Sequence, residues 1–269
     1  MKFYMQSSKN LVSGNTNDKR EWHSELTVVM PVLNEQSCIA QVVNEWLVAL
    51  RLSSINFKIM VLDNGSTDGT FEELQALSKI NKELQIRRYP PVGHGQTCLA
   101  GYKMAILQGC TWVLQIDSDG QCDPQYFPQF WEAREKGICV QGVRTTREDG
   151  FIRLIASRLF SLVTYFISGV YIRDSNVPYR LMDSNVLSLV IQSVPEDFDL
   201  ANIVVSYLFS TKFHIKWVPI NFRERASGQS KRNTRKSIQV TLRYISQLQA
   251  LLKGPTGLVA NTCARLNGR

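Results

Sequence analysis

The sequence predicts an α/β fold of the Rossmann-like type, a mostly parallel sheet with helices on both faces. Three observations lead to this prediction. Short apolar runs alternate with segments of helical spacing from about residue 26 to residue 143. The runs are nearly continuous in apolar residues, which is typical of strands buried on both faces. No internal repeat or low-complexity linker interrupts the alternation.

The first three strand–helix units follow one another closely. Their strands, runs such as LTVVMPV and FKIMVLD, are expected at residues 26–32, 57–63 and, more weakly, 84–89. Their helices, identified by apolar residues three and four positions apart, are expected at residues 37–52, 68–80 and 95–109. The third helix closes on Gly109, a frequent helix terminator.

The remaining elements continue the same pattern. A strand at residues 111–117 (TWVLQID) ends in a carboxylate, and a helix at 124–136 begins with a proline. A further strand follows at 138–143. In sheets of this kind the site lies at the carboxyl ends of the strands, so the residues after each strand are the candidates for function.

The composition is that of an ordinary globular chain that is long enough to bury a large core. Of 269 residues, 44% are hydrophobic and 20% are charged. The longest uncharged apolar run, residues 159–172, has 14 residues, whereas a membrane-spanning helix needs about 20. No secretory signal is readable at the N-terminus, and six cysteines without CxxC spacing favour reduced thiols. We therefore expect a cytoplasmic protein.

The positive charge is concentrated in one segment. The chain carries a net charge of +8, of which residues 221–243 contribute +6, from seven Lys or Arg against one Glu. Such a segment favours contact with phosphates of a small ligand, lipid headgroups or nucleic acid, although a solvated helix face is the simpler alternative. Nucleic acid is the weakest candidate because no nucleic-acid-binding motif accompanies the charge.

The clearest chemical motif follows the strand at 111–117. Asp117 and Asp119 leave the same face of an extended chain, and two close carboxylates repel unless a cation lies beside them. Hard oxygen ligands suit Mg²⁺ or Mn²⁺, and Gln121 offers one more oxygen. The alternative is an Asx turn followed by a cap of the helix at 124.

Two other strand ends carry polar residues toward the same rim. The first strand ends in Pro31-Val-Leu-Asn34-Glu35, and the second in Asp63-Asn64-Gly-Ser66. Asp63 is placed to hydrogen-bond a base or a ribose, while the turn after it could be structural, with Asp68 as a helix cap. The Gly-His-Gly-Gln run at residues 93–96 fails as a dinucleotide fingerprint, and we expect His94 to be a loop residue.

Together these motifs resemble those of the family 2 glycosyltransferases with the GT-A fold, and within them the dolichyl-phosphate mannosyltransferase and polyprenyl-phosphate glycosyltransferase branch. The similarity extends over residues 26–236. The resemblance implies that the segments around Asn34 and Asp63 hold a nucleotide, with Asn64 at a position where the family has Asp. It also implies that the Asp-x-Asp-x-Gln element holds Mg²⁺ or Mn²⁺ on the diphosphate.

Further motifs match the polyprenyl-phosphate branch. A Gly-Ser-Arg of the branch corresponds to residues 142–144, and a Phe-x-x-Arg-x-x-Gly-x-Ser-Lys is matched in full at 222–231. The resemblance assigns Arg225 and Lys231 to the diphosphate. It assigns the acceptor phosphate and the sugar surroundings to Arg144, Arg153, Ser157, Asp174 and Arg180. The branch's Asp-x-x-x-Gly-Phe-Arg is altered here at 174–180, where a proline precedes the aromatic residue.

The implied reaction moves a sugar from a nucleotide-diphosphate sugar to an acceptor in one inverting displacement. A polyprenyl phosphate is already an anion and needs no strong base, whereas a sugar hydroxyl needs one. Candidate bases are Glu196, Asp197 and Asp199, which could instead be helix-start acids. A family 2 transferase with a hydroxyl acceptor and a non-catalytic nucleotide-sugar binder are the alternatives. A sugar nucleotidyltransferase is disfavoured because its glycine-rich loop is absent after the first strand.

The sequence also suggests how the chain divides. Residues 1–24 are expected to be a flexible arm, 25–236 the GT-A domain, and 237–269 a C-terminal helix and tail associated with a membrane or a partner. The apolar segment at 153–172 is flanked by arginines and is expected to lie in a membrane interface, or else in the core or a dimer interface. The expected location is cytoplasmic, peripherally attached to a membrane.

Overall fold

A seven-stranded mixed sheet organises the chain. The structure, a computed structural model, describes residues 24–146, 162, 164–226 and 234–253. The strand order is β3-β2-β1-β4-β6-β5-β7. The strands are β1 (Leu26–Val32), β2 (Phe57–Asp63), β3 (Leu84–Arg88), β4 (Trp112–Gln115), β5 (Ile138–Thr146), β6 (Arg180–Asp183) and β7 (His214–Asn221). Four of the six pairings are parallel, and β6 runs antiparallel to β4 and to β5. The predicted α/β class is confirmed.

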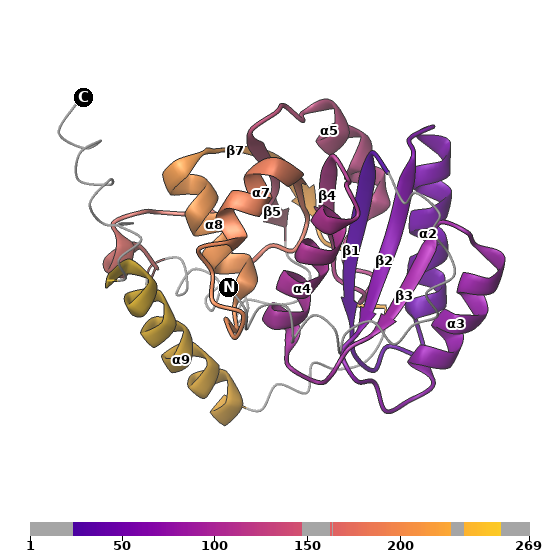
Figure 1. The fold of residues 1–269 in the computed structure, drawn as a ribbon, viewed down its shortest axis with the longest axis horizontal. Helices are drawn as coiled ribbons and strands as arrows, with labels where there is room; N and C mark the ends of the chain where they lie inside the picture. Colours follow the sequence, from indigo (N-terminus) through magenta and orange to yellow (C-terminus); the bar gives the residue numbers. More distant parts are fainter. Residues whose placement is uncertain (1–23, 147–161, 163, 227–233, 254–269) are drawn as a thin grey trace, which may run out of the picture.

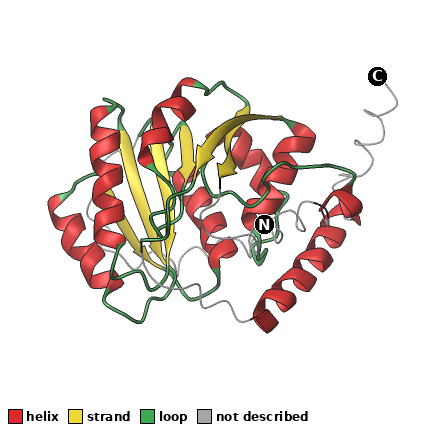
Figure 2. Cartoon of the chain, turned by 180° about the vertical axis from the view of Figure 1, so that it is seen from behind, coloured by secondary structure: helices red, strands yellow, loops and turns green. Residues whose placement is uncertain are grey.

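The helices cover both faces of the sheet, as Figures 1 and 2 show from opposite sides. One buried cluster joins the sheet to α2 (Ile39–Leu52), α3 (Thr70–Ile80) and α5 (Phe127–Glu132). A second cluster joins the other face to α4 (His94–Leu107), α7 (Ser184–Ile191), α8 (Ala201–Lys212) and α9 (Thr234–Lys253). Continuous apolar strands form because their side chains are buried on both faces; all seven residues of β1 are buried.

The parallel register brings three strand ends to one rim. In the β1–β2 pair, Leu26 lies opposite Phe57 and Val32 opposite Asp63, so both strands end level. The pairing of β1 with β4 stops at Val29 and Gln115. Pro31 therefore lies beyond the last β1–β4 pair, where its missing N–H removes no hydrogen bond from that ladder. The segments that follow β1, β2 and β4 emerge side by side.

Some elements differ from the prediction. The helix expected at 124–136 is a 3₁₀ turn at Pro124–Tyr126 followed by the short α5, because Asp123 caps a turn and Pro128 opens a new helix. The four-residue strand β6 was not expected, nor was its antiparallel direction. The boundary expected at residue 236 falls inside α9, whose Tyr244, Leu248 and Leu251 are buried in the second cluster.

No helix in the described ranges is both long and apolar enough to cross a bilayer. Residues 1–23, most of the expected arm, and the first part of the expected interfacial segment lie outside the described residues. Within the described segment, residues 164–168 are helical. Cys38, Cys98, Cys110, Cys122 and Cys139 are buried free thiols.

Candidate active site at the strand ends

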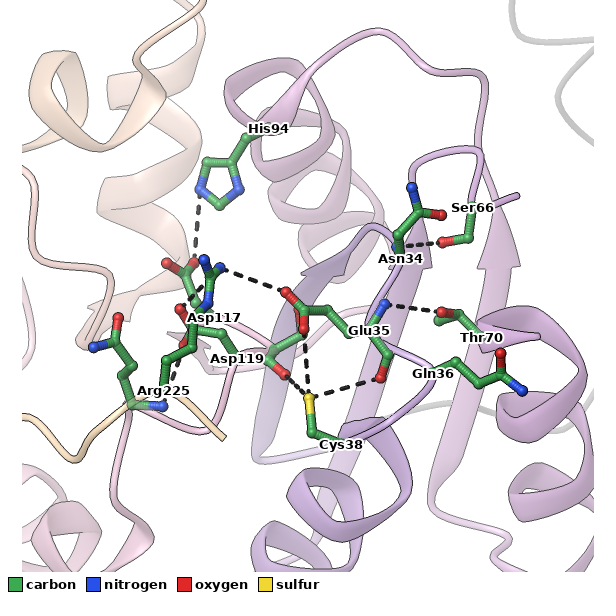
Figure 3. Close-up of polar contacts among 12 residues, drawn as sticks. Asn34, Glu35, Gln36, Cys38, Ser66, Thr70, His94, Asp117, Asp119 and Arg225 are labelled. Carbon is green, nitrogen blue, oxygen red and sulfur yellow. Dashed lines mark hydrogen bonds and ion pairs between the residues drawn. The ribbon is translucent and has the colours of Figure 1, made fainter. Parts of the chain in front are cut away.

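The loops after β1 and β2 are locked together by their own polar side chains (Figure 3). The amide of Asn34 donates to Ser66 Oγ at 3.0 Å, and the amide of Glu35 donates to Thr70 Oγ1 at 2.9 Å. Asn34 Oδ1 in turn accepts from the amide of Thr67 at 2.8 Å. Asn34 has a φ of 54°, a left-handed conformation that asparagine tolerates better than most residues. The sequence-predicted nucleotide segments are thus brought together, and several of their side chains hold the loops in place.

Asp63 ends β2 in a wholly buried position. One carboxylate oxygen, Oδ1, accepts from the amide of Ser66 at 3.0 Å. The other, Oδ2, has no hydrogen-bond partner within the described residues and lies 3.7 Å from Nε of Arg88. The side chain of Asn64 already has a hydrogen bond within the protein, because its Oδ1 accepts from the amide of Val92 at 3.1 Å. A buried acceptor without a hydrogen bond is the kind of group that a ligand donor can satisfy.

The carboxylates of Asp117 and Asp119 lie on the loop after β4. Asp119 is 7% exposed, and its Oδ1 accepts from the amide of Gln121 at 3.2 Å. Its Oδ2 lies 3.3 Å from Nη2 of Arg225, which is also 3.5 Å from Oε1 of Glu35. Burial, together with the nearby Asp117 carboxylate, raises the pKa of Asp119 to about 6, although Arg225 opposes this shift. The arrangement concentrates negative charge that a cation would neutralise.

The structure corrects the expectation for His94. His94 is the first residue of α4 and not a loop residue, and its Nε2 lies 3.6 Å from Oδ1 of Asp117 (Figure 3). That Asp117 oxygen is buried and accepts no hydrogen bond from any described residue. Sequence reasoning missed this contact because 23 positions separate the two residues. The signal that could have found it is that α4 follows β3, whose end lies at the same rim.

A second residue missed by the sequence analysis is Cys38, at the start of α2. Its thiol lies 3.4 Å from Oε2 of Glu35 and 3.8 Å from the carbonyl of Ser118. The thiol therefore connects the loop after β1 to the loop that carries the two aspartates. A small buried cysteine fills this position without adding charge.

The basic segment after β7 runs along the aspartate loop. The amide of Ala226 donates to the carbonyl of Asp119 at 3.0 Å, and the amide of Arg223 donates to the carbonyl of Gln121 at 3.2 Å. The Gln121 side chain donates to the carbonyl of Arg223 at 3.3 Å. Gln121 thus fixes the two segments against each other, and its role as a metal ligand stays a prediction. Gly120 permits the close approach, since it has a φ of +80° and a Cβ there would lie 2.9 Å from Ala226 Cβ.

Arg223, in contrast, is a partly exposed arginine held by two carboxylates, of which Asp123 is buried. Its guanidinium donates to both oxygens of Asp123, at 2.7 and 2.6 Å, and to Glu45 at 2.6 Å. Burial is the largest single influence and lowers the pKa of Arg223, but the hydrogen bonds and charges of Asp123 and Glu45 together outweigh it and keep the pKa above its ordinary value. Part of the positive charge of this segment is therefore structural, and Arg225 is the described arginine that faces the aspartates.

Two arginines assigned to the acceptor side are already engaged. The guanidinium of Arg144 makes a two-pronged ion pair with Asp174, at 2.7 and 2.5 Å, in which both side chains are mostly buried. Arg180 is fully buried, and it donates to the carbonyls of Asn202, at 2.8 Å, and Val177. A phosphate has no access to Arg180 in this geometry, which gives no support to the prediction that it contacts a substrate. Its contacts instead anchor the start of β6.

The candidate bases before α8 are paired with cations. Glu196 lies 2.7 Å from Lys103 of α4, and Asp199 lies 3.1 Å from Arg243 of α9. Asp197 is 69% exposed and lies 3.7 Å from the same arginine. Arg153, Ser157 and Lys231, three further predicted site residues, lie outside the described residues.

The residues present fit a divalent cation that is shared with a ligand. Among the described residues, no group of three or more His, Cys, Asp or Glu side chains is arranged to hold a metal ion by itself. Asp117 and Asp119 supply hard oxygen donors, and one of these oxygens is buried without a hydrogen bond. Mg²⁺ and similar ions are commonly held by one or two carboxylates together with substrate phosphates and water. The geometry suits a metal whose remaining ligands are supplied by a bound molecule and water.

Comparison with known proteins places these features in a family. The family model described as Glycosyl transferase family 2 matches residues 27–188, more than half of the chain. This range includes the strand ends of β1, β2 and β4 and the acidic cluster, by which we mean Asp117 and Asp119.

Curated relatives include two kinds of transferase. The chain is 26% identical over 221 residues to the undecaprenyl-phosphate 4-deoxy-4-formamido-L-arabinose transferase of Edwardsiella ictaluri, covering 80% of this chain and 65% of the relative. It is 27% identical over 215 residues to the polyprenol monophosphomannose synthase of Mycolicibacterium smegmatis, covering 76% and 79%. The chain thus spans less than two thirds of the length of the arabinose transferases that it matches.

Solved structures share the fold. Glucosyl-3-phosphoglycerate synthase from Mycobacterium tuberculosis in complex with uridine-diphosphate superposes with a TM-score of 0.59 at 20% identity, covering 86% of this chain and 81% of that one. The complex of the same synthase with Mn²⁺, uridine-diphosphate-glucose and phosphoglyceric acid gives a TM-score of 0.60 at 20% identity. At this identity the likeness shows the fold alone, and it agrees with the GT-A architecture expected from the sequence.

Proposed function

The chain belongs to glycosyl transferase family 2, and from this premise we propose that it transfers a sugar from a nucleotide-diphosphate sugar to a polyprenyl phosphate. The observation that carries the proposal is the acidic cluster at the strand ends, where Asp117 and Asp119 lie beside Arg225. The acceptor class comes from the relatives named above, an undecaprenyl-phosphate sugar transferase and a synthase of polyprenol monophosphomannose.

The donor nucleotide would bind along the loops after β1 and β2. The buried Oδ2 of Asp63, which lacks a hydrogen bond within the described residues, is placed to accept from a base or ribose. Asn34, Asn64 and Ser66 shape this surface through their contacts with each other's loops and with the turn at Val92. The diphosphate would then lie toward the aspartates of the neighbouring loop.

The leaving diphosphate would be stabilised by fixed positive charge. Asp117 and Asp119 would hold Mg²⁺ or Mn²⁺, which supplies Lewis-acid neutralisation of the charge on the leaving group when bound. Arg225, now shared between Asp119 and Glu35, supplies a guanidinium that can reach a diphosphate oxygen. In the proposed step the bond from the anomeric carbon to the diphosphate oxygen breaks, and the acceptor oxygen forms the new bond from the opposite side.

The pairing of the candidate bases favours a phosphate acceptor over a sugar hydroxyl. Glu196, Asp197 and Asp199 each lie within 4 Å of a cationic side chain, so none is an unshared base. A phosphate oxygen attacks as an anion and does not require a base to remove a proton. We assign recognition of that phosphate to Arg153 and Ser157.

The acceptor lipid would be reached from a membrane surface. Exposed aromatic side chains gather in one stretch of the chain: Tyr165, Phe166 and Tyr171 are 45%, 81% and 60% exposed. Aromatic residues together with basic residues are typical of segments that lie in the membrane interface. We propose peripheral attachment through this stretch.

The test is an extraction assay. The protein is incubated with undecaprenyl or dolichyl phosphate, Mn²⁺ or Mg²⁺ and a panel of labelled nucleotide sugars, and the label in the organic phase is counted. We expect label for the wild type and none for Asp119→Ala. The exposed carboxylate Glu73, on α3, provides the matched control Glu73→Ala, which should transfer as the wild type does.

Metal-dependent release of nucleotide without organic label would contradict the lipid acceptor and redirect the assay to sugar hydroxyls. Label that persists in Asp119→Ala would contradict the role of the acidic cluster.

A further inference from the structure

A turn before α8, anchored by one buried side chain, lies between α9 and the helix start next to the acidic cluster. The turn comprises residues 197–199 and lies between α9 on one side and the first turn of α4 on the other. Phe198, at its centre, is fully buried, and its ring packs edge-on against Tyr244 of α9 with ring centroids 6.1 Å apart. Tyr244 is itself fully buried and shares a hydrogen bond of 2.8 Å with Thr164. Phe198 therefore anchors the turn in the packed interior, whereas the side chain of Asp197 is exposed.

Gln247 of α9 holds both ends of this turn. Its Nε2 donates to the carbonyl of Asp197 at 2.9 Å, and its Oε1 accepts from the amide of Asp199 at 3.3 Å. Arg243, one helical turn earlier, approaches both carboxylates, at 3.7 Å from Asp197 and 3.1 Å from Asp199. One amide side chain thus satisfies a backbone donor and a backbone acceptor of a turn that has no other regular structure.

The opposite side of the turn rests on α4. A Cβ at Gly95 would lie 2.1 Å from the carbonyl oxygen of Asp199, so the turn occupies the space beside this glycine. Gln96 also donates to the carbonyl of Asp197, at 3.4 Å. The residue before Gly95 is His94, whose Nε2 lies 3.6 Å from the buried Oδ1 of Asp117.

These contacts form a continuous path from α9 to the proposed donor site. We propose that α9 acts as a brace for that site: Gln247 and Arg243 are positioning residues that hold the 197–199 turn against α4, so that His94 stays against Asp117. The proposal deepens the proposed transfer reaction and rests on it for its catalytic consequence. The mechanical part, that α9 orders the first turn of α4, stands on the contacts alone.

Two features make His94 dependent on such support. It is the first residue of α4, where amides lack intrahelical partners and helices fray most readily. The preceding Gly93 has a φ of 116° and offers no side-chain cap. The imidazole of His94 is about half exposed and lies 3.6 Å from Sγ of Cys98 on the same helix. The 197–199 turn contacts the next two residues, Gly95 and Gln96, and so supports the helix start that carries His94.

The variant Gln247→Met tests the brace, because it keeps the length of the side chain and removes both of its hydrogen bonds to the turn. The chain offers a matched control in Gln249→Met, since Gln249 is exposed on the same helix. Hydrogen exchange of the 93–99 peptide is the first readout. The amide of Thr97, which donates to the carbonyl of Gly93 at 3.0 Å, should exchange several-fold faster in Gln247→Met than in Gln249→Met. Equal exchange in the two variants would overturn the brace, whatever the protein catalyses.

The second readout is a double-mutant cycle on transfer. We expect Gln247→Met to lower kcat/KM for the donor by about tenfold, which is less than the roughly hundredfold loss that a full 1 Å misplacement can cause. If Gln247 acts through His94, adding Gln247→Met to His94→Ala should cause little further loss. Multiplicative losses would show that the two residues act independently and would overturn the coupling.

The two readouts separate failure of the inference from failure of the proposed function. A wild type that transfers no sugar to polyprenyl phosphate, while Gln247→Met still speeds exchange at residues 93–99, would reject the function and leave the brace standing. Transfer by the wild type, with equal exchange in the two variants, would support the proposed function and reject the brace. A purely global loss of stability would speed exchange throughout the chain and not at the start of α4 alone, which would also overturn the proposal.

Discussion

At the scale of single residues, the acidic cluster is held together at a cost to stability. Asp119 is nearly buried beside a second carboxylate, and only part of its charge is compensated by Arg225 at 3.3 Å. A carboxylate that binds a cation must be ionised, so function requires the form that the folded protein disfavours in the absence of ligand. Sites of this kind commonly gain stability when the charge is removed.

Replacing Asp119 by Asn should therefore stabilise the protein in a pH-dependent manner. The folded pKa of about 6 lies above the ordinary value of 3.8, so the ionisation penalty is absent near pH 4, grows between pH 4 and 6, and is complete above pH 6. Asp119→Asn removes this penalty, and we expect a gain of about 1–3 kcal/mol at pH 7.5 that shrinks toward zero near pH 4. Urea denaturation of the metal-free protein at several pH values measures it.

The exposed Glu73 on α3 gives the control for this experiment. Glu73→Gln should change the stability little at any of these pH values. A gain for Asp119→Asn that increased as the pH was lowered would contradict the assigned direction.

Neutralising Asp174, which forms an ion pair with Arg144, should destabilise the protein, whereas neutralising Asp119 should stabilise it. Both side chains are mostly buried, with 12% and 7% exposed, and removing one partner leaves a buried charge uncompensated. We expect Asp174→Asn to lower the free energy of unfolding by about 3 kcal/mol. The surface pair of Lys216 with Glu135, at 3.3 Å, is the comparison, and Glu135→Gln should cost less than about 1 kcal/mol. Equal effects would mean that Arg144 is not committed to Asp174 and is available to a phosphate.

At the scale of helices and strands, the sequence pattern predicted elements best where burial repeats regularly. The strands at 26–32 and 57–63 match the structure residue for residue, because a fully buried strand is a continuous apolar run. β6 was missed because it is only four residues long and contains a buried arginine, whose charge argues against a core position. Its antiparallel pairing with β4 and β5 joins segments that are far apart in the sequence, which local spacing does not encode.

The site residues that could be predicted are those that lie at the end of a strand or directly after it. Asn34, Asp63 and Asp117 lie at the rim because parallel strands end there, which the sequence shows directly. The positions of His94 and Cys38 were not predictable, since each depends on how a helix start packs against a loop distant in sequence. The engagement of Arg144 and Arg180 by buried partners was missed for the same reason: motif spacing does not show what surrounds a guanidinium.

The packing of α4 against the turn before α8 leads to a prediction for Gly95. A methyl group there would overlap the carbonyl oxygen of Asp199, which is backbone and has little freedom to move. Gly95→Ala should therefore destabilise the fold by about 1–3 kcal/mol and displace the start of α4, despite the higher helix propensity of alanine. Thermal unfolding measures the first effect. An unchanged or raised Tm would show that the turn does not press on α4.

At the scale of the whole molecule, the two halves of the sheet carry different groups of polar residues. The neighbouring strands β2, β1 and β4 carry the acidic cluster and the proposed nucleotide loops, whereas β5 carries Arg144 beyond β6. The segment after β7 returns across this division and places Arg225 against Asp119. The β1–β2–β4 half of the sheet therefore holds the proposed donor site, and the half at β5 is held by the buried ion pair of Arg144 with Asp174.

The charge and the exposed aromatic residues together predict how the molecule meets a membrane. The net charge is +8, with +6 in residues 221–243, and attraction of exposed charges to anionic lipid weakens as salt shortens the screening length. Phe166 and Tyr171, 81% and 60% exposed, would add an apolar contribution that salt does not screen. We therefore expect co-sedimentation with anionic vesicles at low salt, and partial release at high salt.

A matched pair of variants distinguishes insertion of the aromatic residues into the membrane from non-specific adsorption through any exposed apolar side chain. Phe166→Ser combined with Tyr171→Ser should reduce the vesicle binding that survives high salt several-fold. Leu107→Ser, at the end of α4, removes an apolar side chain that is 86% exposed and should leave that binding unchanged. Equal losses in the two proteins would mean that any exposed apolar surface contributes, and absence of binding to anionic vesicles at low salt would contradict peripheral attachment altogether. Because the acceptor's phosphate lies at the lipid surface, loss of this binding should also lower transfer to lipid acceptor in vesicles more than transfer to a short-chain acceptor in solution.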